Sequence, residues 1–373
     1  MAHDIASIAR HFDLAGKPDA IVPITAGHIN DTYVVTTNAR AKTIRYVLQR
    51  INHYVFKEPA QVMTNVLRVT EHIRSKVSRT NPRLASRQLT VIPSDDAPGW
   101  YRDSAGNFWR MYNFVENAIT YDTPESPELA REAARMFGWF QSVLTDLPGP
   151  PLHETIPGFH DTPRRLRYFQ QVLAEDTCNR AGEAAAEIEF VLERAALCDV
   201  LPNLVAKGEL PVRIAHNDTK INNVLLDKDT GQGVCVIDLD TVMPGLSAHD
   251  FGDLVRTAAC PAAEDEQGLS KVTVDLSLFD ALAQGFAQET GRFLTPVEKS
   301  HMVFGGLLIT FEQMIRFLTD HLAGDVYYKV HHEGHNLDRT RTQMKLVQSI
   351  IEQEETLNGL VERAYVNSRE AAN

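Results

Sequence analysis

The stretch His216–Asp240 reads HNDTKINNVLLDKDTGQGVCVIDLD, with polar residues at both ends of an expected β-hairpin. Its apolar segments NNVLLD and VCVIDLD flank the turn segment KDTGQG. If the turn is centred on Thr230–Gly231, Asn223 and Asp238 fall opposite each other at the open end. An amide oxygen and a carboxylate brought together in this way suit Mg²⁺, which takes its other ligands from phosphate and water. The hairpin therefore predicts a magnesium site.

A second carboxylate lies in the loop that enters the hairpin. Asp218 precedes Asn223 by five residues, and His216 precedes Asp218 by two. Beside a metal–phosphate site, a carboxylate can orient a hydroxyl group and accept its proton, as phosphoryl transfer requires. Any one of these residues alone is more simply explained as a turn former or cap in a surface hairpin. The joint spacing H-x-D-x₄-N, followed by an apolar strand that ends in Asp, favours a phosphotransferase site, with His216 bracing the loop.

The elements around the hairpin predict an α+β fold with two lobes. β-branched and aromatic residues predict strands in the first third of the chain, and helical periodicity predicts one helix there, at 58–76. Amphipathic patterns predict helices at 126–144, at 181–197 and from about residue 270 onward. The expected strands are Pro23–Thr37, Thr43–Ile51, Leu89–Ser94 and Phe108–Asn117. A small β-rich lobe (1–113) would thus join a larger α-helical lobe (114–373) near Tyr112–Glu116.

Composition narrows the possible partners. The chain of 373 residues has a net charge of −12 and no Lys/Arg block, which argues against nucleic-acid binding. Four cysteines without a CxxC pair argue against a zinc site or a disulfide framework and fit a reducing cytosol. The first residues do not resemble a signal peptide, and the longest apolar run, Met302–Phe311, falls short of the ~20 residues that span a bilayer. We therefore expect a cytoplasmic protein that binds neither membrane nor nucleic acid.

The hairpin resembles the catalytic loop and the strand-borne metal aspartate of the protein-kinase-like fold. The similarity is greatest to the branch of aminoglycoside phosphotransferases and choline kinases, in which the metal motif reads D-x-D/E. This resemblance implies that Asp218 is the catalytic base. It also implies that Asn223 and Asp238 are Mg²⁺ ligands, that Asp240 is the second acidic residue of the metal motif, and that ATP is the co-substrate.

A literal D-F-G occurs at Asp250–Gly252, within HDFGD, but it does not end an apolar strand. We therefore expect the metal at Asp238 and a capping or supporting role for Asp250. In the branch that the hairpin resembles, a downstream Asp-Leu motif supports the catalytic loop, and Asp253-Leu254 fits that role.

The amino-terminal lobe resembles a nucleotide-binding lobe, although some of the residues typical of such a lobe are missing. AGHINDTYVV is similar to the loop over the ATP phosphates, although it has one glycine and its polar residues are also ordinary turn formers. YVLQRI stands where the family's strand carries a lysine, but here Gln49 is the nearest match and Arg50, beside it, is the alternative cation. MYNFVEN is similar to the hinge that holds adenine, or is a plain buried strand. The candidate nucleotide-binding residues are Gly27, Asn30, Asp31, Gln49, Arg50, Asn113 and Val115.

Three further segments, VLQRIN, Pro157–Leu166 and Thr310–Met344, together resemble bacterial N-acetylhexosamine 1-kinases, over nearly the whole chain. The resemblance implies phosphorylation of the anomeric C1 hydroxyl of N-acetylglucosamine or N-acetylgalactosamine. Arg316 and Asp320, one helical turn apart, could engage the sugar or form a helix salt bridge. Tyr327 could face a sugar ring or pack in the core. The candidate substrate-binding residues are Asp218, His160, Arg316, Asp320 and Tyr327.

Other interpretations remain open at the level of sequence. The chain could be a kinase of another small alcohol, such as choline, an aminoglycoside or an amino alcohol. It could also be an inactive nucleotide-binding module, because the strand lysine is missing. In HHEGH, His331 and His335 could bind zinc only on a continuous helix, and Gly334 interrupts it. We expect these to be polar loop histidines.

Overall fold

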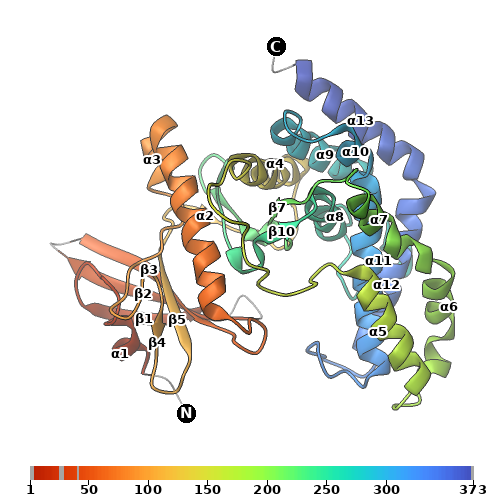
Figure 1. The fold of residues 1–373 in the computed structure, drawn as a ribbon, viewed down its shortest axis with the longest axis horizontal. Coiled ribbons are helices and arrows are strands. Elements are labelled where there is room, and N and C mark those ends of the chain that lie inside the picture. Colours follow the sequence, from red (N-terminus) through yellow and green to blue (C-terminus); the bar gives the residue numbers. More distant parts are fainter. Residues whose placement is uncertain (1–3, 25–28, 40–41, 371–373) are drawn as a thin grey trace.

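The amino-terminal part of the chain forms a five-stranded antiparallel sheet in the order β1-β2-β3-β5-β4. The computed structural model describes residues 4–24, 29–39 and 42–370. Figure 1 shows this sheet and α1 on one side and the helical lobe on the other, with α2 at the junction. The elements are α1 (Ile5–Ala9), β1 (Pro18–Ile24), β2 (Asp31–Ala39), β3 (Lys42–Ile51), β4 (Tyr101–Arg102) and β5 (Phe108–Asn113).

Alternation along β3 gives the two faces of the sheet different neighbours. Tyr46 and Leu48 pack in a cluster with Ile8 of α1 and Trp109 of β5. Ile51 belongs instead to the large core cluster that includes α2 and the helical lobe. Because side chains along a strand alternate between faces, every second residue of β3 is directed toward the junction of the lobes.

Helix α2 (Pro59–Thr80) forms where the sequence predicts a helix at 58–76, and it runs four residues further. Val62, Val66, Val69 and Ile73 recur at helical spacing and are all buried in the large core cluster. The side chain of Asn65 donates to the backbone oxygen of His153 at 2.8 Å and to that of Val242 at 3.1 Å. The helix is therefore fastened to the second lobe by polar as well as apolar contacts.

Three strand predictions differ from the structure. Within the predicted strand Pro23–Thr37, the described residues give the last two residues of β1 and most of β2. The segment Leu89–Ser94 makes only isolated bridges, from Val91 to Tyr112 and from Ser94 to Phe12, and the N–H of Thr90 bonds the side chain of Asn113. The strand from Phe108 ends at Asn113, and Asn117 has a left-handed backbone (φ 52°).

The second lobe is mainly helical and also carries two small sheets, β6-β8-β9 and β7-β10. Its first long helix, α4, begins as the Ser-Pro signal predicts, since the Ser126 side chain accepts the N–H of Leu129 at 3.3 Å. Short helix α3 (Pro82–Ala85) precedes this lobe. The strands are β6 (Ala118–Ile119), β7 (Arg213–Ala215), β8 (Val224–Asp227), β9 (Gly233–Val236) and β10 (Met243–Gly245). The helices are α4 (Pro127–Val143), α5 (Thr162–Glu175), α6 (Ala185–Glu193), α7 (Val200–Ala206), α8 (Ser247–Ala258), α9 (Leu276–Thr290), α10 (Pro296–Ser300), α11 (Met302–Leu322), α12 (His335–Glu352) and α13 (Glu354–Glu370).

Helix α11 is the central helix of this lobe. By length and composition alone it could cross a membrane, but 83% of its most apolar window is buried inside the molecule, as in the core helix of a globular protein. It packs closely against α8, where the literal D-F-G lies. A Cβ atom on Gly252 of α8 would lie 2.3 Å from the backbone oxygen of Gly305, and one on Gly305 would lie 2.1 Å from that of Ala248. Glycine is thus required at this crossing.

We expect Gly305→Ala to lower the free energy of unfolding by ~1–3 kcal/mol, because the added methyl group must push two helix backbones apart. Gly359→Ala in α13 is the matched control, since a Cβ there meets nothing within 4 Å. The control should be neutral or more stable, by up to ~1 kcal/mol, as for Gly→Ala in a helix interior. Urea unfolding of both variants measures the difference, and a Gly305→Ala variant as stable as the control would contradict the close helix contact.

Candidate active site

The hairpin forms where the sequence predicts it, but its register differs by one residue. Ile237 donates its N–H to the backbone oxygen of Asn223 at 2.9 Å, so Ile237 and not Asp238 lies opposite Asn223. The register shifts near Leu225, where β9 has one extra residue, Val234. The difference comes from the turn, which is centred on Asp229–Thr230 because Asp227 donates its N–H to the backbone oxygen of Gln232 at 2.8 Å; the bulge recovers part of it. Asp238 follows with a left-handed backbone (φ 60°), which turns the chain out of the strand direction.

Asp218 lies in the loop between β7 and β8 and is bound from two sides. Its carboxylate is 3.1 Å from the ammonium group of Lys220 and accepts the amide N–H of Asn223 at 3.3 Å. The same Asn223 nitrogen also donates to the backbone oxygen of Asp218 at 2.9 Å. Burial alone would raise the pKa of Asp218, but the charge of Lys220 and its hydrogen bond to the carboxylate lower it below its ordinary value. Asp218 is therefore ionised at neutral pH.

His216 braces the loop, as expected. Its Nδ1 atom accepts the N–H of Asp218 at 3.3 Å, and its Nε2 atom lies 3.0 Å from the backbone oxygen of Ile237. These partners require the neutral tautomer that carries its proton on Nε2. The ring is fully buried and packs edge-on against Phe137 and Phe140 of α4. His216 thus ties the catalytic loop to the end of β9.

Asp250, in the first turn of α8, supports the same loop. Its carboxylate accepts the backbone N–H of His216 at 2.9 Å and that of Asn217 at 2.7 Å. Its own backbone oxygen accepts the hydroxyl of Thr219 at 2.6 Å. The supporting role predicted for Asp250 therefore extends to the loop that carries Asp218. Asp253, which the sequence comparison favoured for that task, instead forms an ion pair with Arg256 at 2.9 Å.

Asp238 is the exposed carboxylate of this group. Crowding by the surrounding protein, followed by repulsion from Asp240 and Asp218, raises the pKa of Asp238 to about 6. A divalent cation would relieve this repulsion. The amide nitrogen of Asn223 donates to Asp218, and the Oδ1 atom of Asn223 is the atom that could bind a cation.

The donor set fits Mg²⁺ and not zinc. Among the residues that the structure describes, no group of three or more His, Cys, Asp or Glu side chains is arranged to hold a metal. Mg²⁺ needs only one or two protein oxygens when phosphates and waters supply the rest. Asp238 and the amide oxygen of Asn223 could provide these oxygens.

The histidines of HHEGH have carboxylate partners: Nε2 of His332 lies 2.9 Å from Asp338, and that of His335 lies 2.9 Å from Asp265. Helix α12 begins only at His335.

Asp240 is enclosed between the lobes. Both of its carboxylate oxygens accept hydrogen bonds from the guanidinium of Arg110, and one also accepts the Asn30 amide at 2.8 Å. The two ionised side chains are 1% and 2% exposed. Asp240, which the resemblance implies is the second acidic residue of the metal motif, is thus bound by the buried guanidinium of Arg110 on β5.

The remaining nucleotide-site candidates lie on and around the sheet. Gln49 donates to the Thr32 hydroxyl at 3.1 Å, and its oxygen accepts from Arg110 at 3.0 Å. Arg50, the next residue, lies on the opposite face of β3 and pairs with Asp31 at 2.7 Å. Gly27 lies outside the described residues.

The hinge candidates lie at the end of β5. The side chain of Asn113 accepts the N–H of Thr90 at 2.7 Å and donates to the backbone oxygen of Gln88 at 3.1 Å. Val115 is buried in a small cluster with Val234 and Cys235 of β9. The segment 88–90, which does not form the expected strand, is therefore held against the hinge by an asparagine side chain.

His160 lies beside the catalytic loop. Its Nε2 atom is 3.1 Å from the backbone oxygen of Asn217, and its Nδ1 atom is 2.9 Å from Glu312 of α11. Burial lowers the pKa of His160, but the Glu312 carboxylate outweighs this and raises it. Burial likewise opposes ionisation of Glu312, yet His160 holds its pKa at about 2. The two side chains form a buried ion pair that fixes His160 next to the loop.

Arg316 and Asp320 have different partners in the structure. Arg316 donates to the Gln313 side chain at 3.0 Å, and its guanidinium lies 5.9 Å from the ring centroid of Phe159 and 5.7 Å from that of Tyr328. Asp320 accepts backbone N–H groups of residues 326–328 at 2.8–3.0 Å and the Asn336 amide at 2.9 Å. Asp320 thus shapes the loop that presents Tyr327, whose residue surface is 68% exposed.

Sequence reasoning missed three charged residues of this region. Lys220 could have been found, because it lies two residues after Asp218 in the quoted motif. Arg110 and Glu312 could have been singled out but not paired, since each meets its partner more than a hundred residues away along the chain. Charged residues within apolar segments, as in FWRMYN and ITFEQM, were the available signal.

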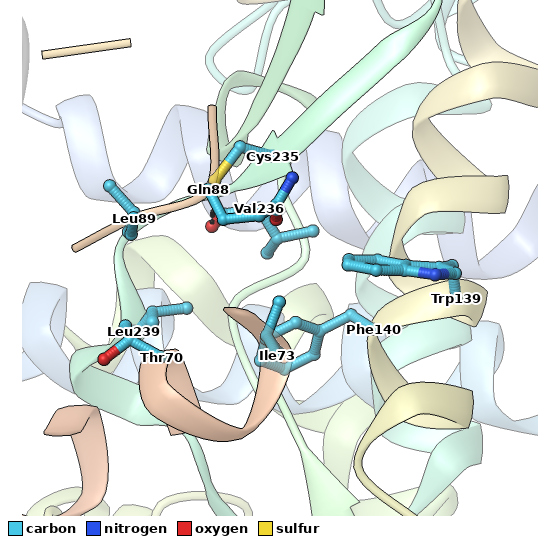
Figure 2. Close-up of a pocket in the computed structure, with 9 residues that line it drawn as sticks. All are labelled: Thr70, Ile73, Gln88, Leu89, Trp139, Phe140, Cys235, Val236 and Leu239. Carbon is cyan, nitrogen blue, oxygen red and sulfur yellow. Dashed lines mark hydrogen bonds between the residues drawn. The ribbon is translucent and has the colours of Figure 1, made fainter. Parts of the chain in front are cut away.

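One small cavity lies under the hairpin, apart from these residues (Figure 2). Its volume is about 10 Å³, which is room for a single water at most. Figure 2 shows its mainly apolar walls, which come from α2, α4 and the end of β9. It is a packing gap within the core and not a ligand site. Its lining residues are Thr70, Ile73, Gln88, Leu89, Trp139, Phe140, Cys235, Val236 and Leu239.

Comparison with known proteins places this geometry among phosphotransferases. The family model described as phosphotransferase enzyme family matches residues 20–284. An aminoglycoside phosphotransferase from Alicyclobacillus acidocaldarius is similar with 15% identity and a TM-score of 0.55, over 98% of this chain and 96% of that chain. A choline kinase from Cryptosporidium parvum is similar with 13% identity and a TM-score of 0.54, over 92% and 91% of the two chains.

Spectinomycin phosphotransferase, solved with ADP and spectinomycin, is similar with 12% identity and a TM-score of 0.53, over 94% of this chain and 97% of that chain. At such low identity these likenesses establish the fold and not the substrate. They confirm the predicted α+β, two-lobed protein-kinase-like fold.

We expect Asp238→Ala to weaken Mg²⁺ binding in the presence of ADP more than Asp250→Ala does. Asp250→Ala should instead lower the free energy of unfolding by at least about 2 kcal/mol, because two buried N–H groups lose their acceptor. Calorimetric Mg²⁺ titrations and urea unfolding of both variants separate the two effects. If Asp250→Ala lost Mg²⁺ binding and Asp238→Ala did not, the literal D-F-G would be the metal motif.

Proposed function

The chain belongs to the phosphotransferase enzyme family, and from this premise we propose that it transfers the γ-phosphoryl group of ATP to a sugar. The proposed acceptor is the anomeric C1 hydroxyl of an N-acetylhexosamine, either N-acetylglucosamine or N-acetylgalactosamine. The products are ADP and a sugar 1-phosphate. The observation that carries the proposal is the convergence of Asp218, Lys220 and Asn223 in one braced loop, next to the exposed carboxylate of Asp238.

In the proposed reaction, Asp218 orients the acceptor hydroxyl toward the γ-phosphorus and accepts its proton. The new bond joins the sugar oxygen to phosphorus, while the bond between phosphorus and the β,γ-bridging oxygen breaks and ADP leaves. The lowered pKa of Asp218 makes it a weak base, which suffices because the transition state is loose and the hydroxyl loses its proton late. Bound Mg²⁺, held by Asn223 and Asp238, would neutralise phosphate charge.

We assign nucleotide binding to the first lobe, residues 1–113, and catalysis with acceptor binding to residues 114–373. ATP as the phosphoryl donor is supported by the fold, which is shared with a spectinomycin phosphotransferase solved with ADP. The proposed ATP-contacting residues are Gly27, Asn30, Asp31, Gln49, Arg50, Asn113 and Val115. Cytoplasmic location is proposed because ATP is available there, and the four cysteines are free thiols, as suits a reducing compartment.

The charges beside the catalytic loop favour a neutral acceptor over a cationic one. Arg256, like Lys220, lies close enough to Asp218 to lower its pKa. Arg165 and Arg316 form a second group of cations, since burial and then the charge of Arg316 lower the pKa of Arg165. Choline and aminoglycosides are cations and would be repelled by such a group. Sugar hydroxyl and amide oxygens can accept hydrogen bonds from it.

The carboxylates of the same region already have cationic partners. Asp253 and Glu264 both pair with Arg256, at 2.9 and 2.8 Å. Glu312 pairs with His160 at 2.9 Å. A cationic acceptor would have to break these pairs to gain a counter-ion, whereas a neutral sugar would leave them intact.

The C1 position rests on the resemblance to N-acetylhexosamine 1-kinases. Two of the segments that carry this resemblance, Pro157–Leu166 and Thr310–Met344, meet beside the catalytic loop through His160 and Glu312. Their contact supports a common acceptor site, and exposed Tyr327 is proposed as the surface for the sugar ring. Asp320 would act by shaping the loop that carries Tyr327.

Asp218→Asn should reduce kcat by ~10²–10⁴-fold, the usual contribution of a general base. The fold and the affinity for ATP should change little, because the amide has the same shape and phosphate binding depends on other groups. Steady-state kinetics together with a calorimetric ATP titration test both parts. A variant with near-wild-type kcat would remove Asp218 from the base role.

A phosphorylation screen with Mg·ATP over free sugars, amino alcohols and aminoglycosides tests the acceptor. N-acetylhexosamines should be substrates, their 1-methyl glycosides should be inert, and the 6-deoxy sugars should still react. Phosphorus-coupled proton NMR should show the phosphate coupled to H1. Coupling to the H6 protons would contradict C1 while leaving a sugar kinase, and turnover of choline alone would replace the sugar by an amino alcohol. ATP binding without turnover of any acceptor would indicate an inactive nucleotide-binding module.

A further inference from the structure

Arg110 of β5 is the buried cation between the two lobes. Its Nη1 and Nη2 atoms donate to the two carboxylate oxygens of Asp240, and the second of these bonds measures 2.9 Å. Its Nε atom donates to Gln49 on β3 at 3.0 Å. The guanidinium carbon also lies 5.2 Å from the ring centroid of Tyr112. The fork geometry of arginine is thus fully engaged, with only 1% of its side chain exposed.

Several elements of the first lobe meet at this one carboxylate of the second lobe. Arg110 comes from β5 and Gln49 from β3, while Asn30 precedes β2 and donates to Asp240 at 2.8 Å. The side-chain oxygen of Asn30 in turn accepts the N–H of Asn52, just beyond β3, at 3.0 Å. Through these bonds, the backbone leading into β2 is fixed relative to the chain that carries the proposed metal ligands.

A merely structural contact between the lobes would not need charges. A buried ion pair gains little or nothing over apolar residues of the same volume, because both ions lose their water. Asp240, however, follows Asp238 by two residues and repels it, as Asp218 does. Arg110 acts in the opposite sense on Asp238 and so offsets a concentration of negative charge that must also receive nucleotide phosphates.

We propose that Arg110 is a positioning residue of the phosphoryl-transfer site, which holds Asp240 and Asn30 so that Asp238 and the backbone before β2 face the same Mg²⁺-bound phosphates. This inference rests on the proposed function and adds to it the source of the first lobe's essential cation. It accounts for Gln49 on β3, where the resemblance expects a lysine. The positive charge has its place on β5, and the amide of Gln49 orients it. Arg110 touches neither nucleotide nor acceptor in this role.

The test compares four variants by Mg·ADP binding, which needs no knowledge of the acceptor. Arg110→Met removes the cation, and Arg110→Met/Asp240→Asn removes both charges so that no unpaired ion remains buried. Arg110→Met/Gln49→Lys returns a cation on the neighbouring strand, at the residue whose side chain contacts Arg110. Arg102→Met, at an exposed arginine of β4, is the control. Calorimetry gives the dissociation constant of ADP at several Mg²⁺ concentrations, and thermal unfolding gives Tm.

Arg110→Met should raise the dissociation constant of Mg·ADP by ~10–100-fold, the usual effect of removing a partner that orients a metal ligand. The double-neutral variant should recover Tm but not affinity, and Gln49→Lys should recover much of the affinity. Arg102→Met should bind as the wild type does. Wild-type affinity in the double-neutral variant would show that the ion pair only stabilises the fold and would overturn the inference. Recovery of Tm without affinity in the Gln49→Lys variant would do the same.

Failure of the proposed function would look different from failure of this inference. A wild-type chain that does not bind Mg·ADP would overturn both. A wild-type chain that binds Mg·ADP, together with an Arg110→Met variant of equal affinity, would overturn only the role of Arg110.

Discussion

The conformation of the loop that carries Asp218 depends on one buried carboxylate. Asp250 accepts two consecutive backbone N–H groups, those of His216 and Asn217, and Asn217 has a left-handed backbone with φ 63°. Such a conformation is costly for a residue other than glycine and persists only where the surroundings fix it. The direction in which Asp218 leaves the loop, and hence its contacts with Lys220 and Asn223, follows from this anchor.

Features formed by residues close together in the sequence could be predicted, whereas contacts between residues far apart in the sequence were missed. The hairpin could be predicted, because both of its strands and its turn lie within one short stretch of the sequence. The same stretch contains Asp218, Asn223 and Asp238, so their spacing could be read from it directly. The exact register could not, since no residue type marks where the turn is centred within KDTGQG or where β9 carries its extra residue. Nor could the partner of Asp240, because Arg110 is 130 residues away along the chain and only the folded sheet brings it near.

The literal D-F-G illustrates why a motif needs its structural context. Asp250 supports a loop, Phe251 packs against Phe279 and Phe286, and Gly252 lets α8 approach α11. Each of the three residues has a packing or hydrogen-bonding role on a helix. In the sequence, the lack of a preceding apolar strand is what distinguishes this motif from Asp238, which follows such a strand.

The fastening of α2 has a consequence for how the two lobes can move. Asn65 binds two backbone oxygens of the second lobe, and the valines of α2 are buried in the same core cluster as α4 and α8. We therefore expect this helix to move with the helical lobe, although it precedes β4 and β5 in the chain. An opening between the lobes would then separate the sheet from α2 and would have to break the hydrogen bonds of Asn30 and Arg110 to Asp240.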